Sequence, residues 1–178
     1  MGRRIVLLRG INVGAHKRIP MAELRELFSG AQFDDVRTYV QSGNVVLSSD
    51  AAPQELEQRS ERLIAERFGF DVPVIVRTGE ELAAAVERDP LGDVADNPKL
   101  YQVSFMAVEP DDGLLERLSA VAAPGERLVA RGREVYSWHP GGAARSKLWA
   151  KLAGSGLGVK TTARNWTTVT KLLEMANA

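Results

Sequence analysis

Residues 5–28 read IVLLRGINVGAHKRIPMAELRELF, and this stretch sets the pattern for the rest of the chain. The apolar run Ile5–Leu8 is typical of a buried strand, and a loop with two glycines follows it. Pro20 is a favoured residue in the first turn of a helix. Apolar residues then recur at helical spacing, at Met21, Leu24, Leu27 and Phe28. The stretch therefore predicts a strand, a loop and a helix in succession.

The elements that follow complete a β-α-β-β-α-β order. They are predicted strands at Val36–Val40, Val45–Leu47 and Val72–Val76, and a predicted helix at Pro53–Phe68. Gln41-Ser42-Gly43-Asn44 has the turn chemistry of a hairpin between the first two of these strands. Pro73 favours an edge position for the last strand, because proline has no backbone N–H to donate. This order is that of the ferredoxin-like, split-βαβ motif.

The remaining residues repeat the same order. They hold predicted strands at Tyr101–Val108, Arg127–Ala130, Glu134–Trp138 and near Val159–Thr161, and predicted helices at Leu114–Val121, at Ser146–Ala153 and after Asn165. We therefore predict an α+β fold with two related halves and a C-terminal helix. The expected domains are residues 1–79 and 99–178, connected by a helix and a turn-rich stretch at residues 80–98.

Basic and acidic residues are sorted along the chain, although the net charge is zero. Residues 1–30 carry six basic and two acidic side chains, and residues 131–178 carry eight and two. The residues between them carry nine basic and nineteen acidic side chains. If the fold brings the two ends together, they form a cationic face that attracts anionic ligands.

The composition excludes several kinds of site. The chain has no cysteine, which excludes disulfides, thiol nucleophiles and cysteine-bound metals. The only two histidines, His16 and His139, lie far apart in the chain and disfavour a zinc site, so we expect no metal and no cofactor. No apolar run approaches the ~20 residues that span a bilayer. We therefore expect a cytoplasmic protein that contacts no membrane.

Polar residues gather at one end of the predicted first sheet. In the split-βαβ motif the first two strands run parallel, so the loop Gly10–Lys17 and the hairpin Gln41–Asn44 leave the sheet at the same end. The segment Gly69–Asp71 belongs to that end as well. Amide groups such as that of Asn12 can read hydrogen-bonding edges of bases, sugars or peptides. Arg9 offers a planar fork to a phosphate or carboxylate.

Each of these residues also has a structural interpretation. Arg9 can pair with an acidic side chain, and the glycines and amides can serve the turns alone. At the other end of the chain, Arg164 and Trp166 flank Asn165, the expected N-cap of the last helix. The indole of Trp166 either stacks on a base while the helix start holds a phosphate, or it packs in the core.

Four motifs carry a resemblance to a known family. They are Leu7–Gly14, Lys17–Leu24, Val36–Val46 and Ala163–Lys171. Over essentially its whole length the chain resembles the bacterial "domain of unknown function" family number 1697. The resemblance implies an α+β fold with a ferredoxin-like N-terminal half, and it implies no established activity, cofactor or catalytic residue. Ala15-His16 stands where the family often has another glycine and a polar residue.

These observations favour a binding module over an enzyme. The first hypothesis is a basic face that holds a nucleotide or single-stranded nucleic acid. Its ligand-binding residues are expected to be Arg9, Asn12, Lys17, Gln41, Asn44, Arg164 and Trp166. The second hypothesis is a small enzyme for a phosphorylated or carboxylated substrate, although no general base is evident. The third is an interaction or assembly protein, and the oligomeric state is left open.

Overall fold

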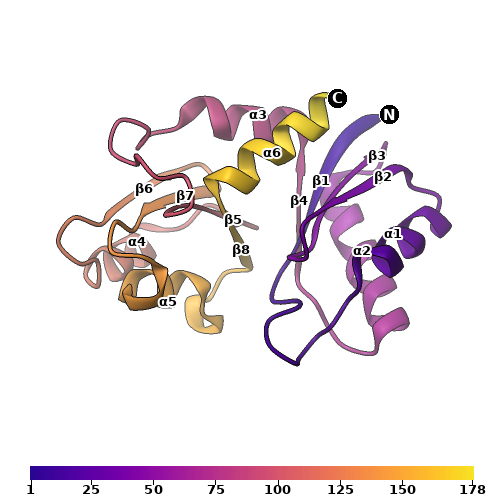
Figure 1. Ribbon diagram of the computed structural model, residues 1–178, viewed down its shortest axis with the longest axis horizontal. Helices are drawn as coiled ribbons and strands as arrows, with labels where there is room; N and C mark the ends of the chain where they lie inside the picture. The colour runs from indigo at the N-terminus through magenta and orange to yellow at the C-terminus, as the bar shows by residue number, and fades with distance from the viewer. The chain divides into compact units, whose positions relative to one another are not determined.

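The computed structural model describes residues 1–178 and contains two four-stranded antiparallel sheets (Figure 1). The elements of the first half are β1 (Gly2–Leu8), α1 (Met21–Gly30), β2 (Asp34–Tyr39), β3 (Asn44–Ser49), α2 (Pro53–Phe68), β4 (Val74–Thr78) and α3 (Gly79–Arg88). Those of the second half are β5 (Tyr101–Met106), α4 (Asp112–Ser119), β6 (Arg127–Arg131), β7 (Glu134–Trp138), α5 (Lys147–Ala153), β8 (Thr161–Asn165) and α6 (Trp166–Asn177). Two short 3-10 turns, η1 (Ala143–Arg145) and η2 (Ser155–Leu157), flank α5.

The two sheets have the same topology. The first has the strand order β2-β3-β1-β4, and the second has the order β6-β7-β5-β8. Each strand of the second sheet therefore takes the place of its counterpart in the first, and α4 and α5 follow their strands as α1 and α2 do. The predicted α+β fold with two βαββαβ halves is confirmed. β4 lies at a sheet edge, as Pro73 had indicated.

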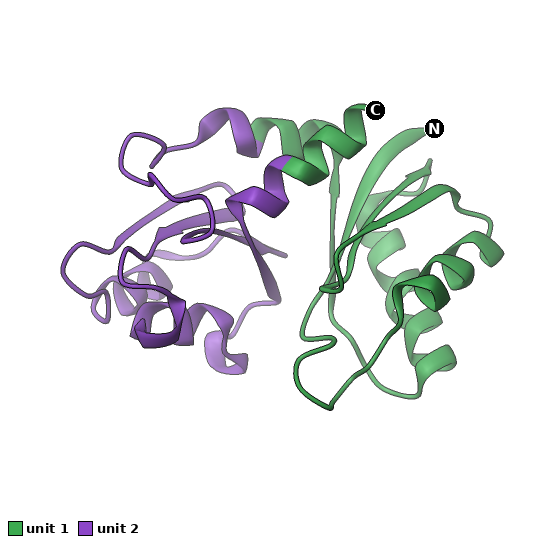
Figure 2. Ribbon diagram, viewed as in Figure 1, with its two compact units in different colours: residues 1–84, 171–178 green, residues 85–170 purple.

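The chain forms two compact units (Figure 2). The first contains residues 1–84 and 171–178, and the second contains residues 85–170. The predicted boundaries differ from this division at the C-terminus, which the sequence placed in the second half. Two guanidinium groups of the first unit bind the last turn of the chain: Arg37 donates to the Met175 carbonyl (2.8 Å) and Arg3 to the Ala178 carbonyl (3.0 Å).

The core of the first unit lies between its sheet and the helices α1 and α2. Side chains alternate across a strand, so Val6 and Leu8 of β1 face the helices. Their partners include Leu24 and Phe28 of α1 and Leu56 and Ile64 of α2, all of them buried completely. This packing fixes the ends of β1 and of its neighbours, where the loops of interest begin.

The second unit repeats this arrangement with its own helices. The apolar cluster consists of Met106, Leu114, Leu118, Val135, Leu148, Leu152 and Leu157, from two strands, both helices and η2. The last strand differs from the prediction near Val159–Thr161, because β8 runs from Thr161 to Asn165. Most residues of β8 are polar, so its sequence lacks the apolar pattern of a strand. The segment is a strand because it forms a hydrogen-bonded ladder with β5.

Candidate functional site

Three chain segments meet at one end of the first sheet. The β1–α1 loop contacts the β2–β3 hairpin, where the Leu8 amide donates to the Gly43 carbonyl (2.9 Å). It also contacts the segment before β4, where the Arg9 amide donates to the Pro73 carbonyl (2.9 Å). The predicted convergence is confirmed. We call residues 9–19, 39–44 and 69–73 the loop end.

Asn12 joins two of these segments through its side chain. Its Nδ2 donates to the Gln41 carbonyl (2.7 Å) and to the Ile19 carbonyl (2.9 Å), and its Oδ1 accepts from the Ile19 amide (2.8 Å). Both amide hydrogens are thus used within the protein. Asn12 also has a positive φ of 55°, which asparagine tolerates better than most residues. These bonds shape the loop, and the predicted contact of Asn12 with a ligand stays a prediction.

The two predicted amides of the hairpin have different environments. Asn44 is completely buried, and its Nδ2 donates to the Tyr39 carbonyl (3.1 Å) and to Ser42 Oγ (3.4 Å). It stabilises the turn from inside. The side chain of Gln41 is exposed and makes no hydrogen bond, since only its backbone carbonyl is engaged. Of the two, Gln41 alone presents its side chain to solvent.

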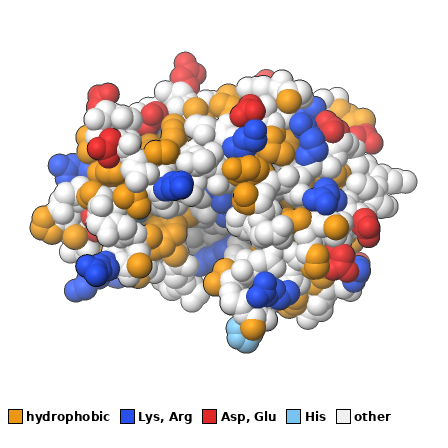
Figure 3. All heavy atoms as spheres, viewed as in Figure 1, with side chains coloured by type: hydrophobic (Ala, Val, Ile, Leu, Met, Phe, Trp, Pro, Cys, Tyr) orange, Lys and Arg blue, Asp and Glu red, His pale blue; other side chains and the backbone are white.

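The β1–α1 loop carries exposed cations. Lys17 Nζ donates to the Asp71 carbonyl (2.8 Å), a neutral partner that leaves the ammonium charge uncompensated. Arg18 is exposed and has neither a hydrogen bond nor an ion pair. His16 is exposed beside them, and Arg9 is half-buried. Figure 3 shows Lys and Arg side chains on one face of the molecule, some of them beside an exposed His side chain and others near Asp and Glu side chains.

Three of the five non-glycine residues with positive φ lie at the loop end. Asn12, Lys17 and Val40 all have φ between 51° and 55°. Val40 is the most unusual, because a β-branched residue in the left-handed region is a genuine outlier. Its side chain is 49% exposed, and that of Val13 is 70% exposed, so two apolar side chains face solvent here. Such strain persists where the surrounding structure enforces it, often at binding sites.

Arg164 lies inside the second unit, within β8. It pairs with Val103 of β5 and is 8% exposed, and its Nη1 donates to Thr162 Oγ1 (2.7 Å) and to the Ala163 carbonyl (2.8 Å). Burial lowers the pKa of the guanidinium to about 10. Arg164 directly precedes the N-cap of α6, as predicted, but it belongs to β8 and its side chain is buried there, because β8 extends further than its sequence indicates.

Trp166 begins α6 directly after the strand. Its indole stacks on the Tyr101 ring, with centroids 4.9 Å apart and planes 24° apart. Asn165 Oδ1 accepts from the Thr168 amide (2.9 Å), which confirms the predicted N-cap. Burial, followed by a hydrogen bond to Asp89, raises the pKa of Tyr101. One face of the indole is thus occupied by the protein, as in the packing interpretation.

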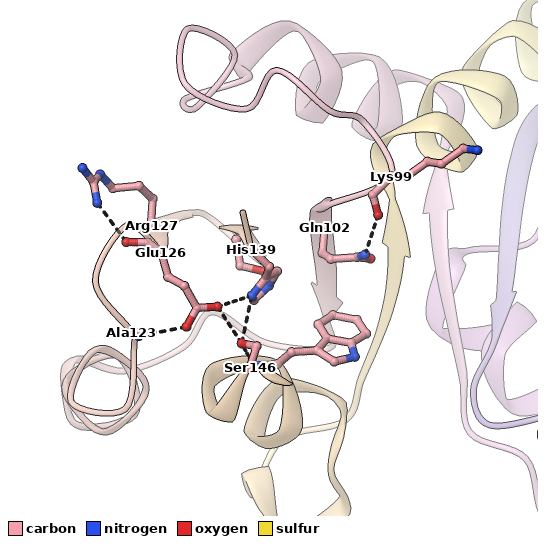
Figure 4. Close-up of polar contacts among 9 residues, drawn as sticks. Lys99, Gln102, Ala123, Glu126, Arg127, His139 and Ser146 are labelled. Carbon is pink, nitrogen blue, oxygen red and sulfur yellow. Dashed lines mark hydrogen bonds and ion pairs between the residues drawn. The ribbon is translucent and has the colours of Figure 1, made fainter. Parts of the chain in front are cut away.

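The second unit contains a buried polar network that the sequence did not predict. The Glu126 carboxylate points toward both His139 and Ser146 (Figure 4). Its Oε2 lies 2.6 Å from His139 Nδ1 and accepts from Ser146 Oγ at 2.6 Å, while His139 Nε2 lies 2.8 Å from Ser137 Oγ. His139 and Ser137 are completely buried. A glycine-rich turn between His139 and Ser146 was the only local sign of this network.

The geometry of this network favours a structural role. An acid, a histidine and a serine follow one another, but no substrate reaches Ser137 or the imidazole. Burial would raise the pKa of Glu126, yet hydrogen bonds from Ser146, the Ala123 amide and His139 hold it below its ordinary value. Ser146 Oγ also accepts from the Trp149 amide (2.9 Å) and so caps α5. The network therefore anchors α5 to the sheet.

Comparison with known proteins places the chain in a family. The model for "Protein of unknown function (DUF1697)" matches residues 1–136. The chain belongs to the DUF1697 family. The match covers the loop end and extends to Tyr136 of β7. No curated protein matches the chain.

A solved structure supports the fold of this DUF1697 protein. The structure of a conserved bacterial protein from Streptococcus pneumoniae superposes with a TM-score of 0.80 and 22% sequence identity, covering 98% of each chain. This likeness concerns the fold alone. The DUF1697 protein has no cluster of three His, Asp or Glu side chains suited to a metal ion. None of its helices has the length and hydropathy that a membrane-spanning helix needs.

Proposed function

We propose that this protein binds an anionic ligand, either a nucleotide or single-stranded nucleic acid, at the loop end of its first unit. The observation that carries the proposal is the uncompensated charge of Lys17 and Arg18. Lys17 donates only to a carbonyl and Arg18 has no partner, so both can pair with phosphate without breaking an ion pair. Phosphate contacts of this kind supply most of the affinity for nucleic acid.

The backbone of the loop favours the approach of a phosphate. Gly10 and Gly14 have φ of 69° and 63°, and a Cβ at either position would meet no atom within 4 Å. Open backbone in a left-handed conformation can present its N–H groups to an anion. The bonds of Asn12 hold the loop in this conformation against the hairpin.

Neighbouring side chains suit the other parts of a nucleotide. The exposed amide of Gln41 can donate to or accept from a base or sugar edge. Val13 and Val40 offer apolar surface to the face of a base. The proposed contacts therefore keep Arg9, Lys17 and Gln41 from the sequence prediction and add Arg18, Val13 and Val40. Whether Arg164 and Trp166 of the second unit contribute stays a prediction.

Salt-dependent binding tests the proposal. The affinity for labelled oligothymidylate and for a labelled nucleotide is measured by fluorescence anisotropy over a range of salt. For single strands, log K falls with log salt by ~0.7 for each phosphate contact. Lys17→Gln/Arg18→Gln should therefore reduce the slope for the oligonucleotide by about 1.4.

The single variant Arg18→Gln should reduce the slope by about 0.7, and Arg62→Gln is its matched control. Arg62 is an exposed arginine of α2 in the same unit, and it also has no partner. Its removal should leave the slope and the affinity unchanged. Absence of binding to both ligands, or an equal loss with Arg62→Gln and Arg18→Gln, would contradict a specific site at the loop end.

A further inference from the structure

A cavity in the second unit lies beside α4 and α5. Its volume is about 290 Å³, at the small end of the range in which proteins hold small molecules. The residues that define it here are Leu114, Leu118, Leu157, Ala150, Arg117 and Lys151. The cavity belongs to the second unit, and the loop end belongs to the first.

The floor of this cavity is apolar. Leu118 is completely buried, and Leu114 and Leu157 are 6% and 9% exposed, so the cavity opens onto the hydrophobic cluster of the second unit. One wall is closely packed, because a Cβ at Gly154 would lie 2.8 Å from the Ala150 carbonyl oxygen. A cavity with an apolar floor is expected to favour an apolar group over water.

The rim of the cavity is cationic. Arg117 lies in the last turn of α4 and Lys151 in the last turn of α5. The helix dipole accounts for a cation at each of these places. Neither side chain has a hydrogen bond or an ion pair, however, and no acidic side chain lines the cavity. Two uncompensated positive charges therefore lie beside an apolar hollow.

We propose that this cavity binds a small amphipathic carboxylate. Its apolar chain would lie on the three leucines, and its carboxylate would pair with Arg117 and Lys151. The volume suits a medium-length acyl chain or an aryl group rather than a long-chain lipid. The proposal is independent of the function proposed for the first unit.

The test compares octanoate with 1-octanol, which has the same chain without the charge. Each is titrated into the full-length ¹⁵N-labelled protein, and amide shifts are followed by NMR. Saturable shifts should appear at residues 114–118 and 150–157. Ion pairs with exposed side chains such as Arg117 and Lys151 are worth up to about 1 kcal/mol each, so octanoate should bind roughly tenfold more tightly than octanol.

Variants separate the charge from the cavity. Arg117→Gln/Lys151→Gln should lower the affinity for octanoate to that for octanol, and leave octanol binding unchanged. Lys147→Gln is the matched control, because Lys147 lies one turn earlier on the same helix and outside the cavity lining. Ala150→Phe introduces a ring at an exposed lining position and should abolish binding of both compounds.

Several outcomes would overturn the proposal. They are equal affinity for octanoate and octanol in the unmodified protein, no saturable shift near the cavity, and an equal loss with Lys147→Gln. The dispersion of each variant's spectrum shows that it is folded. A double variant that unfolds is replaced by Lys151→Gln alone, which should reduce octanoate binding about twofold to fivefold.

Discussion

Ser146→Ala should strongly destabilise the second unit. The hydroxyl accepts from the Trp149 amide as the N-cap of α5, and removing such a cap costs about 0.5–2 kcal/mol. It also donates to the Glu126 carboxylate, and a hydrogen bond to a charged group is worth about 1.5–3 kcal/mol. Glu126 keeps its bonds to His139 and to the Ala123 amide. The expected loss is about 2–4 kcal/mol.

Tryptophan fluorescence reports the stability of the second unit, where Ser146 lies. All three tryptophans, Trp138, Trp149 and Trp166, lie within residues 85–170. Urea unfolding followed by their emission therefore reports the second unit. A loss of this size should lower the midpoint by about 1–2 M urea.

Ser155→Ala provides the control for this measurement. Ser155 is exposed at the start of η2 and makes no side-chain hydrogen bond. Its replacement should change the unfolding free energy by no more than about 0.5 kcal/mol. A loss below about 0.5 kcal/mol for Ser146→Ala, or equal losses for the two variants, would refute the anchoring role of the network.

Three further variants test other parts of the structure. The pKa of Glu126 is lowered in the folded protein, so the carboxylate stabilises the fold above the unfolded pKa of 4.5, and this stability is lost as pH falls through the folded pKa. The difference in unfolding free energy between the parent protein and Glu126→Gln should therefore shrink below about pH 4.5. Tryptophan emission measures both unfolding free energies. Asn12→Ala should lower the unfolding free energy of the first unit by about 3–4 kcal/mol, because three hydrogen bonds are lost. Asn12→Gly should lower it by about 1 kcal/mol less, because glycine tolerates a φ of 55°. Hydrogen exchange of the β1 amides measures both losses, and equal losses would argue against backbone strain. Val40→Asn should stabilise the first unit by about 1 kcal/mol in the same exchange measurement, and it should weaken oligonucleotide binding. A lower stability of this variant would show that the left-handed conformation of Val40 is not strained.

The sequence predicted most accurately those helices and strands that begin or end at characteristic capping or turn residues. The helix Pro53–Phe68 was placed correctly at both ends, because proline begins its first turn and Gly69, with φ of 81°, provides the left-handed C-cap. The strand β8 was misplaced, because its alternation of Thr, Ala, Arg and Asn carries little hydrophobic signal. Its position depends on hydrogen bonds to β5, which come from a distant part of the chain.

The candidate site was predictable only as a location. The order of strands and helices implies that the Asn12 loop and the Gln41 hairpin share one end of the sheet, and this follows from topology. Which side chains face solvent does not follow. Gln41 and Asn44 have similar amides three residues apart, yet one is exposed and the other is completely buried. That difference depends on how the hairpin packs against β1.

For this protein, periodicity, caps and turn residues are sufficient for the order of elements and for the repeat of the βαββαβ motif, because these depend on neighbours within a few residues. The pairing of polar and charged side chains cannot be predicted in the same way. The approach of Glu126 to His139, the bonds of Asn12 and the absence of a partner for Arg18 all depend on contacts between distant segments. Hydrogen bonding and burial act over a few ångströms in space, so only the folded chain establishes which polar groups are satisfied and which remain available to a ligand.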